Sequence, residues 1–311
     1  MKGKITILGS ATVDLIFKGK IFDEREVKNR LSLALGGKYI VDEFYQYFGG
    51  GGANAAISLA RQGFDVSLIA KVGKDVFGKR IRENLKREGI KKDLLMPTAK
   101  ATQISAILVD SDGDRTIANY RGDADLIDLT KKIQKKIKKA AWFVIFSMAK
   151  LPKAKKLDFL RFAKQQGVKI FLSLHGTEYF KGFDYLKDYF KLADIVHMNA
   201  HECADIFGGN AEDFNYHKTN FGKKIGISLL VVSYDIKGSF AYTKEKIYHQ
   251  PIIDTKKIAD TTGAGDAFAS GFLGKFIKTG DIKTSLKFAT KNAASVIEHL
   301  GAQNGLLYNR R

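Results

Sequence analysis

From about Gly52 onward, short apolar runs alternate with amphipathic segments along the chain. Each run has the length of a strand, and the segments between several of them suit helices. This rhythm of strand, helix and strand predicts a parallel sheet that helices cover on both faces. The runs that we predict as strands are VSLIAKV, WFVIFSM, KIFLSL, ADIVHM and SLLVVS.

Two regions, residues 12–48 and 99–122, break this rhythm with alternating apolar and polar positions. In the second of them, ISAILVDSDGDRTIANY contains the dipeptide Asp112-Gly113, which favours a hairpin. We expect the two regions to pair into a small second sheet that forms a lid. Since no internal repeat or proline-rich hinge divides the sequence, residues 1–311 are predicted to form a single domain.

A chain of 311 residues with 45% hydrophobic residues is long enough to bury a substantial core. Its single cysteine, Cys203, excludes an internal disulfide, and no stretch approaches the roughly 20 apolar residues of a membrane span. The opening segment MKGKITILGSATVDLIF lacks the pattern of a signal peptide and is predicted as the first strand. We therefore expect a soluble, cytoplasmic protein.

The formal charge of +19 raises the question of a nucleic-acid partner. The lysines are scattered along the full length, and the densest run is TKKIQKKIKK at residues 130–139. Ile133 and Ile137 are four residues apart there, as in a surface helix with a solvated basic face. No basic arm or aromatic-interleaved patch accompanies the charge, so we do not expect nucleic acid as a partner. A positive field still attracts anionic substrates.

Three other motifs are incomplete. GKDVFGKR differs from a P-loop because Arg80 stands where the loop needs a hydroxyl for Mg²⁺. GGGANA fits GxGxxA, but the alternating VDEFYQYF before it is not a buried apolar strand. His201 and Glu202 begin an HExxH-like stretch in which Asp205 replaces the second histidine, so we predict no zinc site. Cys203 is expected to be a small core residue.

The stretch ADTTGAGDAFASGF places two glycines and an aspartate where a helix begins. Phe268, Phe272 and Phe276 recur every four residues and predict a helix after Asp266. The uncrowded amides of a glycine turn, together with the positive end of the helix dipole, form a site for an anion such as phosphate. For this stretch taken alone, an ordinary glycine turn with a first-turn acid is the alternative.

Three stretches taken in order carry a resemblance: GGGGANAAISLARQG, the tetrapeptide Asn199-Ala200-His201-Glu202, and DTTGAGDAFASGF. Together they resemble the ribokinase-like, PfkB-type family of carbohydrate and nucleoside kinases, and the similarity runs along nearly the whole chain. The resemblance implies an α/β fold of ribokinase-like, doubly wound type, with a mainly parallel central sheet flanked by helices and a small β-sheet lid. It also implies transfer of the γ-phosphate of ATP to a hydroxyl group.

By this resemblance, Asp266 is the base that takes a proton from the substrate hydroxyl. Phosphoryl transfer needs mainly an in-line nucleophile and donors aimed at the equatorial oxygens, so a weak base such as aspartate suffices. The resemblance assigns those donors to the backbone amides of Gly263, Ala264, Gly265 and Asp266.

Five residues match family positions that contact hydroxyl groups of the substrate. An aspartate accepts hydrogen bonds from two hydroxyls, an asparagine both donates and accepts, and glycines let a sugar approach closely. The five residues are Asp14, Gly49, Gly50, Gly52 and Asn54.

The resemblance also implies two metal sites. Asn199 and Glu202 would organise Mg²⁺ and the nucleotide phosphates through water, because Mg²⁺ prefers oxygen ligands and retains several waters. A pair of residues that caps a helix is the alternative explanation of this motif. A monovalent-cation site, for K⁺, would lie beside the anion-binding turn and consist of Asp260 and Thr262 with carbonyls near Val296, His299 and Gly301.

The sequence departs from the family near the expected nucleotide site. Where the family usually carries TxGxxG, this chain has Ser233, Asp235 and Gly238, so an aspartate replaces a glycine. The strand FLSLHGTE also lacks the DxN of many sugar kinases, which leaves the substrate open. A sugar kinase leads, and an adenosine-type nucleoside kinase is the alternative of the same family. The alternative of another functional class is a catalytically silent relative that binds sugar or nucleotide as a sensor. Pairing of two chains through the lid is a further hypothesis.

Overall fold

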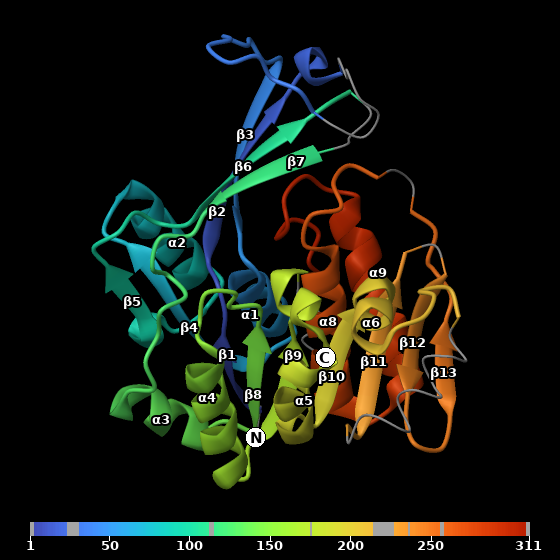
Figure 1. The fold of residues 1–311 in the computed structure, drawn as a ribbon. Coiled ribbons are helices and arrows are strands. Elements are labelled where there is room, and N and C mark those ends of the chain that lie inside the picture. Colours follow the sequence, from blue (N-terminus) through green and yellow to red (C-terminus); the bar gives the residue numbers. More distant parts are fainter. Residues whose placement is uncertain are drawn as a thin grey trace.

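The computed structural model describes residues 3–23, 31–111, 115–174, 176–213, 227–235, 237–255 and 258–308. Its largest element is a nine-stranded sheet in the order β13-β12-β11-β10-β9-β8-β1-β4-β5 (Figure 1). The strands are β1 (Lys4–Leu8), β4 (Asp65–Gly73), β5 (Leu95–Thr98), β8 (Trp142–Phe146), β9 (Lys169–Ser173), β10 (Ile195–Asn199), β11 (Leu229–Tyr234), β12 (Gly238–Tyr242) and β13 (Ile247–Gln250).

The central sheet is parallel from β5 to β11, and β12 and β13 are antiparallel additions at one edge. The chain passes from β1 outward to β4 and β5 and then returns to β8 on the other side of β1. This reversal confirms the doubly wound prediction. It also locates the switch point, beyond the carboxyl ends of β1 and β8, where open α/β sheets bind ligands.

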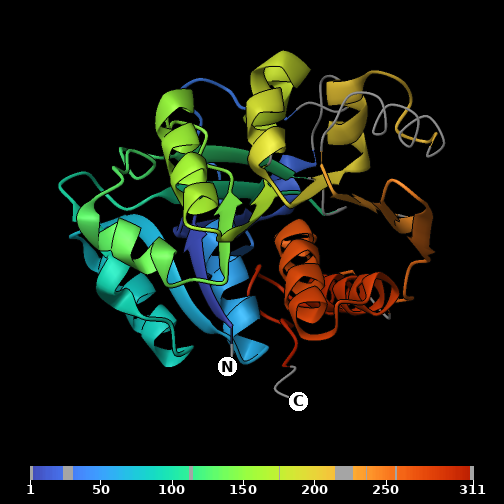
Figure 2. The ribbon, with the colours of Figure 1, turned by 90° about the horizontal axis from the view of Figure 1, so that it is seen from below.

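Helices cover both faces of the central sheet, as Figure 2 shows from below. One layer contains α1 (Gly51–Arg61), α2 (Val76–Arg87), α8 (Ala264–Thr279) and α9 (Ile282–Ile297), and the other contains α3 (Lys131–Lys138), α4 (Lys153–Gln165), α5 (Gly182–Leu192) and α6 (Ala200–Phe207). Short 3-10 turns are η1 (Lys20–Phe22), η2 (Lys92–Leu94) and η3 (Gly176–Lys181).

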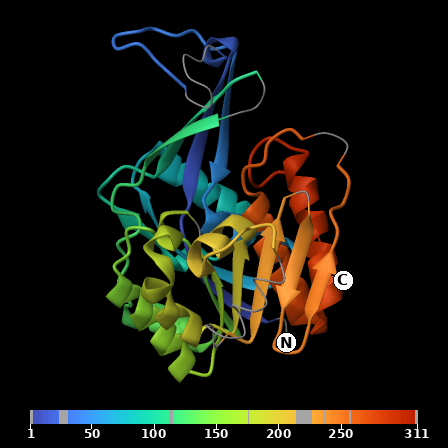
Figure 3. The ribbon, with the colours of Figure 1, turned by 45° about the vertical axis from the view of Figure 1, so that its right-hand side comes forward.

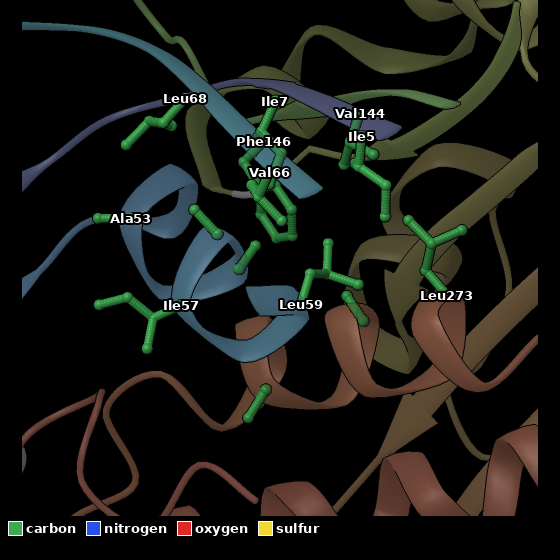
Figure 4. Close-up of a cluster of buried hydrophobic side chains, with 14 of the residues drawn as sticks. Ile5, Ile7, Ala53, Ile57, Leu59, Val66, Leu68, Val144, Phe146 and Leu273 are labelled. Carbon is green, nitrogen blue, oxygen red and sulfur yellow. The ribbon is translucent and has the colours of Figure 1, made fainter. Parts of the chain in front are cut away.

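Each face of the sheet buries its own hydrophobic cluster. In the cluster of Figure 4, Ile5 and Ile7 of β1 pack with Ile57 and Leu59 of α1 and with Leu273 of α8. Because alternate residues of a strand point to opposite faces, Leu8 lies in the other cluster, together with α3 and α4. The cluster of Figure 4 holds α8 against the sheet, and α8 carries the predicted anion-binding turn.

A second sheet of four strands stands apart from the first, in the order β3-β2-β6-β7 (Figures 1 and 3). It is built by β2 (Thr12–Lys18), β3 (Glu43–Gly49), β6 (Ile104–Val109) and β7 (Arg115–Tyr120). The central pair β2-β6 is parallel, and both outer pairs are antiparallel. The predicted hairpin between β6 and β7 is present, while its turn residues Asp112 and Gly113 lie outside the described residues.

The opening segment differs from its prediction as one strand, since it forms β1 of the central sheet and β2 of the small sheet. The break falls at Gly9. A Cβ atom there would lie 2.6 Å from the Cα of Gly52, so the chain end of β1 packs directly on the start of α1 and turns away. This backbone contact lies in the three-residue connection between the two strands, and the apolar pattern of the segment does not indicate it. In the described part of the chain, no helix has both the length and the apolar character to cross a membrane.

Candidate active site

The first turn of α8 is positioned by a glycine. Gly263 has a positive φ of 80°, and a Cβ atom at this residue would lie 2.4 Å from the Cβ of Ala302. Only glycine fits both the conformation and the contact. The helix then begins at Ala264 and runs for 16 residues, so its positive dipole end and first amides face the space in front of the turn.

A cavity of about 470 Å³ opens on one side of this turn. It lies at the switch point, since Ser10 follows β1 and Ser147 follows β8 directly. The small sheet supplies another wall, with Thr12 and Asp14 from β2 and Asn119 from the end of β7. The remaining lining residues are Gly50, Gly51, Asn54, Gln103, Ile104, Ser105, Tyr120, Arg121, Thr262, Gly263, Gly265 and Asp266.

A chain of side-chain amides orients the carboxylate of Asp266. The Nδ2 of Asn54 donates to Oδ2 of Asp266 at 2.8 Å, and the Oδ1 of Asn54 accepts from Nε2 of Gln303 at 3.0 Å. Gln303 in turn accepts from Asn84 at 2.9 Å. Residues from α1, α2, α8 and the C-terminal segment therefore converge on one carboxylate. Asn54, predicted as a substrate contact, lines the cavity and also holds Asp266.

Asp14 faces the same cavity and is buried. Burial raises the pKa of this carboxyl, hydrogen bonds from Ser105 and Thr12 lower it, and the charges of Asp260 and Asp266 raise it further. The close fit also explains the neighbouring glycine, because a Cβ atom on Gly49 would lie 2.1 Å from Oδ2 of Asp14. Gly49 thus makes room for the carboxylate.

A second cavity, of about 630 Å³, opens on the other side of the turn. Asn199, Ser233, Asp235 and Gly238 line it near the carboxyl ends of β10 and β11. Gly265 lines both cavities. The first turn of α8 is therefore the place where the two spaces meet. The other lining residues, largely apolar, are Tyr234, Ile252, Ile253, Asp254, Thr255, Ile258, Thr261, Ala264, Phe268, Thr290, Ala293, Ala294 and Ile297.

Asn199 and Glu202 form a capping box at the start of α6. The Oδ1 of Asn199 accepts from the Glu202 amide at 2.8 Å, and Oε2 of Glu202 accepts from the Asn199 amide at 2.9 Å. This is the alternative that the motif alone left open. The capping box occupies one lone pair of the Asn199 Oδ1 and one of the Glu202 Oε2. It is therefore compatible with contacts from these side chains to water around Mg²⁺. Within the described ranges, no group of three or more His, Cys, Asp or Glu side chains could hold a metal ion.

Both carboxylate oxygens of Asp260 accept hydrogen bonds from nitrogen donors. Its Oδ1 accepts from the Thr262 amide at 2.8 Å and from Nη1 of Arg115 at 3.1 Å, while its Oδ2 accepts from the Gly301 amide at 3.1 Å. A guanidinium already balances this carboxylate, and the K⁺ site that the resemblance implies stays a prediction. Because Arg115 begins β7, the ion pair joins the small sheet to the main body.

The structure brings most predicted site residues together around the two cavities, but not all of them. Of the residues described, neither Gly49, Gly52, Glu202 nor Asp260 lines either space. Sequence reasoning missed several polar residues of the first cavity, which lie on loops and small-sheet strands without a motif of their own: Ser10, Thr12, Gln103, Ser105, Asn119, Arg121 and Ser147.

His197 is another residue whose place the sequence did not indicate. It is buried, its Nδ1 lies 2.9 Å from Oγ of Ser173, and its Nε2 lies 3.2 Å from Oγ of Ser233. The ring also packs 5.4 Å from that of Phe268. Since Ser233 and Phe268 line the second cavity, His197 supports that wall from behind.

Comparisons with known proteins agree on one relationship. The sequence model of the pfkB family carbohydrate kinases matches residues 2–308. A ribokinase of Lactococcus lactis is 27% identical to this chain over 97% of its length and 93% of the ribokinase. A 5-dehydro-2-deoxygluconokinase of Clostridium botulinum is 27% identical over 82% of this chain and 79% of the other. The chain spans 54% of a longer relative, the bifunctional ribokinase/ribose-5-phosphate isomerase A of Fructilactobacillus sanfranciscensis, which is 27% identical.

The fold has a close counterpart among solved structures. An Arabidopsis thaliana ribokinase complexed with ribose and ATP superposes with a TM-score of 0.83 and 22% identity, covering 97% of this chain and 95% of the other. This confirms the predicted arrangement of a mostly parallel central sheet, flanking helices and a separate small sheet.

Proposed function

The chain belongs to the pfkB family of carbohydrate kinases, and on that premise we propose that it transfers the γ-phosphate of MgATP to a hydroxyl group of a small sugar. The observation that carries this proposal is the meeting of two cavities at Gly265. The first, lined by hydroxyls, amides and carboxylates, suits the sugar. The second, largely apolar with polar residues near the turn, suits the nucleotide.

In the chemical step, Asp266 accepts the proton of the attacking hydroxyl while that oxygen bonds to the γ-phosphorus and the bond to the leaving oxygen of ADP breaks. The start of α8 stabilises the charge on the transferring group through its dipole and amides. The Ala264 amide donates to the Thr261 carbonyl at 3.3 Å. We therefore assign the phosphate contacts to the amides of Gly263, Gly265 and Asp266.

Mg²⁺ would be held mainly by the phosphates of the nucleotide, with Asn199 and Glu202 contacting its waters. When bound, it would neutralise phosphate charge. The capping box fixes both side chains at the start of α6, and Asn199 lines the second cavity. We also propose that the small sheet closes over the sugar, because it forms a wall of the first cavity and excludes competing water. A dimer through this sheet and a cytoplasmic location remain proposals.

One residue introduces a sugar acid as a second candidate for the acceptor. Arg121 lines the first cavity, and its Nη1 lies 3.7 Å from Oδ2 of Asp125. That carboxylate is shared, since Asp125 also accepts from Nε2 of Gln103 and from the Lys150 amide, each at 3.1 Å. A guanidinium facing a sugar cavity is suited to a carboxylate on the substrate. A ketodeoxy acid is therefore the second candidate beside a ribose-like sugar.

The test is ATP consumption over a panel of ribose, fructose, ketodeoxy acids, adenosine and other nucleosides, with Arg121→Gln as a parallel enzyme. If the acceptor is an acid, Arg121→Gln should raise its KM by at least about tenfold, because a charge-assisted hydrogen bond is lost. The KM of a neutral sugar should change little in this variant. Turnover confined to nucleosides would overturn the sugar assignment.

Asp14→Ala should raise the KM of the accepted sugar about 10- to 150-fold, as expected when a hydroxyl loses an ionised acceptor worth ~1.5–3 kcal/mol. In the wild type, KM should also rise as the pH falls toward the raised pKa of Asp14, because the protonated carboxyl accepts hydrogen bonds less well. Steady-state kinetics between acidic and neutral pH measure both effects. A KM with the same pH dependence in wild type and variant would remove Asp14 from the sugar site.

Asp235→Gly should lower the KM for ATP several-fold, most strongly at low ionic strength. Asp235 is exposed and lines the second cavity, and two unit charges ~8 Å apart repel by ~2 kcal/mol at an effective dielectric near 20, before screening. Lys237 does not remove this repulsion alone, since its Nζ lies 3.4 Å from Oε2 of Glu212. Asp235→Asn is the control: an improvement with glycine but not with asparagine would mean that backbone freedom, not charge, is responsible.

A further inference from the structure

A third cavity, of about 380 Å³, lies at the amino ends of β1 and β4, beside α3. It is at the end of the central sheet opposite the small sheet (Figure 1). It shares no lining residue with the two cavities that meet at Gly265. A ligand of this cavity would therefore bind apart from the places of the sugar and the phosphate donor.

The floor of this third cavity is polar where a buried sheet is normally apolar. Lys4 pairs with Asp65 and Thr6 with Ser67 in the β1-β4 register, and all four line the cavity. The next pair on the same face, Leu8 with Ile69, is apolar and lies in the core beside α3. Parallel strands covered on both faces usually read as continuous apolar runs, so this half of the face is a departure. The hydroxyl residue Thr6 is 2% exposed and Ser67 is 6% exposed, so the polar floor is built into the fold.

The walls of the third cavity carry an excess of positive charge. Six lysines and two aspartates line it. Both aspartates are paired, Asp65 with Lys91 and Asp93 with Lys136, each at 2.7 Å. Within the part of the chain that the structure describes, the other four lysines have no carboxylate partner within 4 Å: Lys4, Lys132, Lys135 and Lys139.

We propose that this cavity binds a small polyanion with two or more phosphate groups. Four unpaired ammonium groups around one concavity suit several phosphate charges, which lysine binds as a point charge. The Ser67 hydroxyl adds a donor at the floor, whereas the Thr6 hydroxyl donates to the Lys136 carbonyl at 3.5 Å. The volume is that of a small-molecule site, whereas a nucleic-acid duplex needs an extended basic surface. The ligand class is therefore a phosphorylated metabolite or nucleotide that acts away from the site of phosphoryl transfer.

Helix α3 offers a matched pair of double variants. Lys132 and Lys135 line the cavity, whereas Lys131 and Lys138 belong to the same helix, are also exposed and do not line it. Changing either pair to glutamate alters the net charge equally. Each double variant also places one glutamate in the first turn and one in the last, so dipole effects are alike.

The binding of inorganic tripolyphosphate, measured by calorimetry in magnesium-free, low-salt buffer, tests the proposal. Lys132→Glu/Lys135→Glu should weaken one binding event at least about tenfold, because two of four cations become anions. Lys131→Glu/Lys138→Glu should stay within about twofold of wild type, since screening by solvent weakens distant charges. A second event at the turn before α8 should be the same in all three proteins. In acetylation footprinting, the probe should protect Lys132 and Lys135 but not Lys131 and Lys138.

Three outcomes would overturn this site. An equal loss in both double variants would mean attraction by the general positive field, and no loss in either would place the anion elsewhere. A short DNA duplex that binds more tightly than tripolyphosphate, with the same dependence on Lys132 and Lys135, would make this a nucleic-acid surface. Melting curves and sugar phosphorylation without the probe should match wild type in both variants, because the four lysines are exposed.

Discussion

Asp266→Asn is expected to lower kcat by at least about a hundredfold while leaving the affinities for sugar and ATP within a few-fold, as for the loss of a general base. The amide keeps the shape of the carboxylate, and its oxygen can still accept the hydrogen bond from Asn54. What it loses is the capacity to take the proton of the attacking hydroxyl. Steady-state kinetics and calorimetric titration of each substrate separate the two effects.

The control for this variant is Asp260→Asn, which removes a carboxylate that touches the same turn but lines neither cavity. It should loosen the pairing with Arg115 and affect kcat far less than Asp266→Asn. If Asp266→Asn kept most of the wild-type kcat, Asp266 would not be the base. An equal loss in the two variants would point to the shape of the turn and not to proton transfer.

Lys156→Met is expected to lower the free energy of unfolding by ~3–5 kcal/mol, the usual cost of leaving one partner of a buried ion pair alone. Lys156 and Glu178 are each 1% exposed and form a salt bridge. Glu178 also accepts from Oγ of Ser147 at 3.1 Å and from the Met148 amide at 3.2 Å. The pair thus holds the loop after β8, which contributes Ser147 to the first cavity.

Urea unfolding of the double variant Lys156→Met/Glu178→Gln supplies the comparison. Because it leaves no uncompensated charge, it should recover at least about half of the stability that Lys156→Met loses. If the single and double variants were equally stable, the cost would come from lost packing around Lys156 and not from the stranded charge of Glu178.

The elements that a local pattern encodes could be predicted from the sequence. Buried strands are continuous apolar runs, and the turn before Asp266 needs the glycines that it has, so both were visible without the fold. The capping of α6 by Asn199 and Glu202 was equally readable as one of two alternatives.

The rest depends on residues far apart in the chain. Arg115 meets Asp260 across 145 positions, and Gln303 meets Asn54 across 249, with no periodic signal for either contact. Gly49 was predicted to admit the sugar, whereas its missing side chain makes room for Asp14. Such roles follow from which backbones approach each other, and a single sequence does not contain that information.

The central claim is that a hydroxyl of the substrate bound in the first cavity attacks the nucleotide bound in the second, at the turn that joins them. Following the label from γ-labelled ATP tests it most directly. With an accepted sugar or sugar acid, the label should appear in a phosphate ester of the acceptor, and Asp266→Asn should still bind both substrates while transferring almost none. Label released as free phosphate at a rate independent of the acceptor, or binding of both ligands by the wild type without any transfer, would contradict the account.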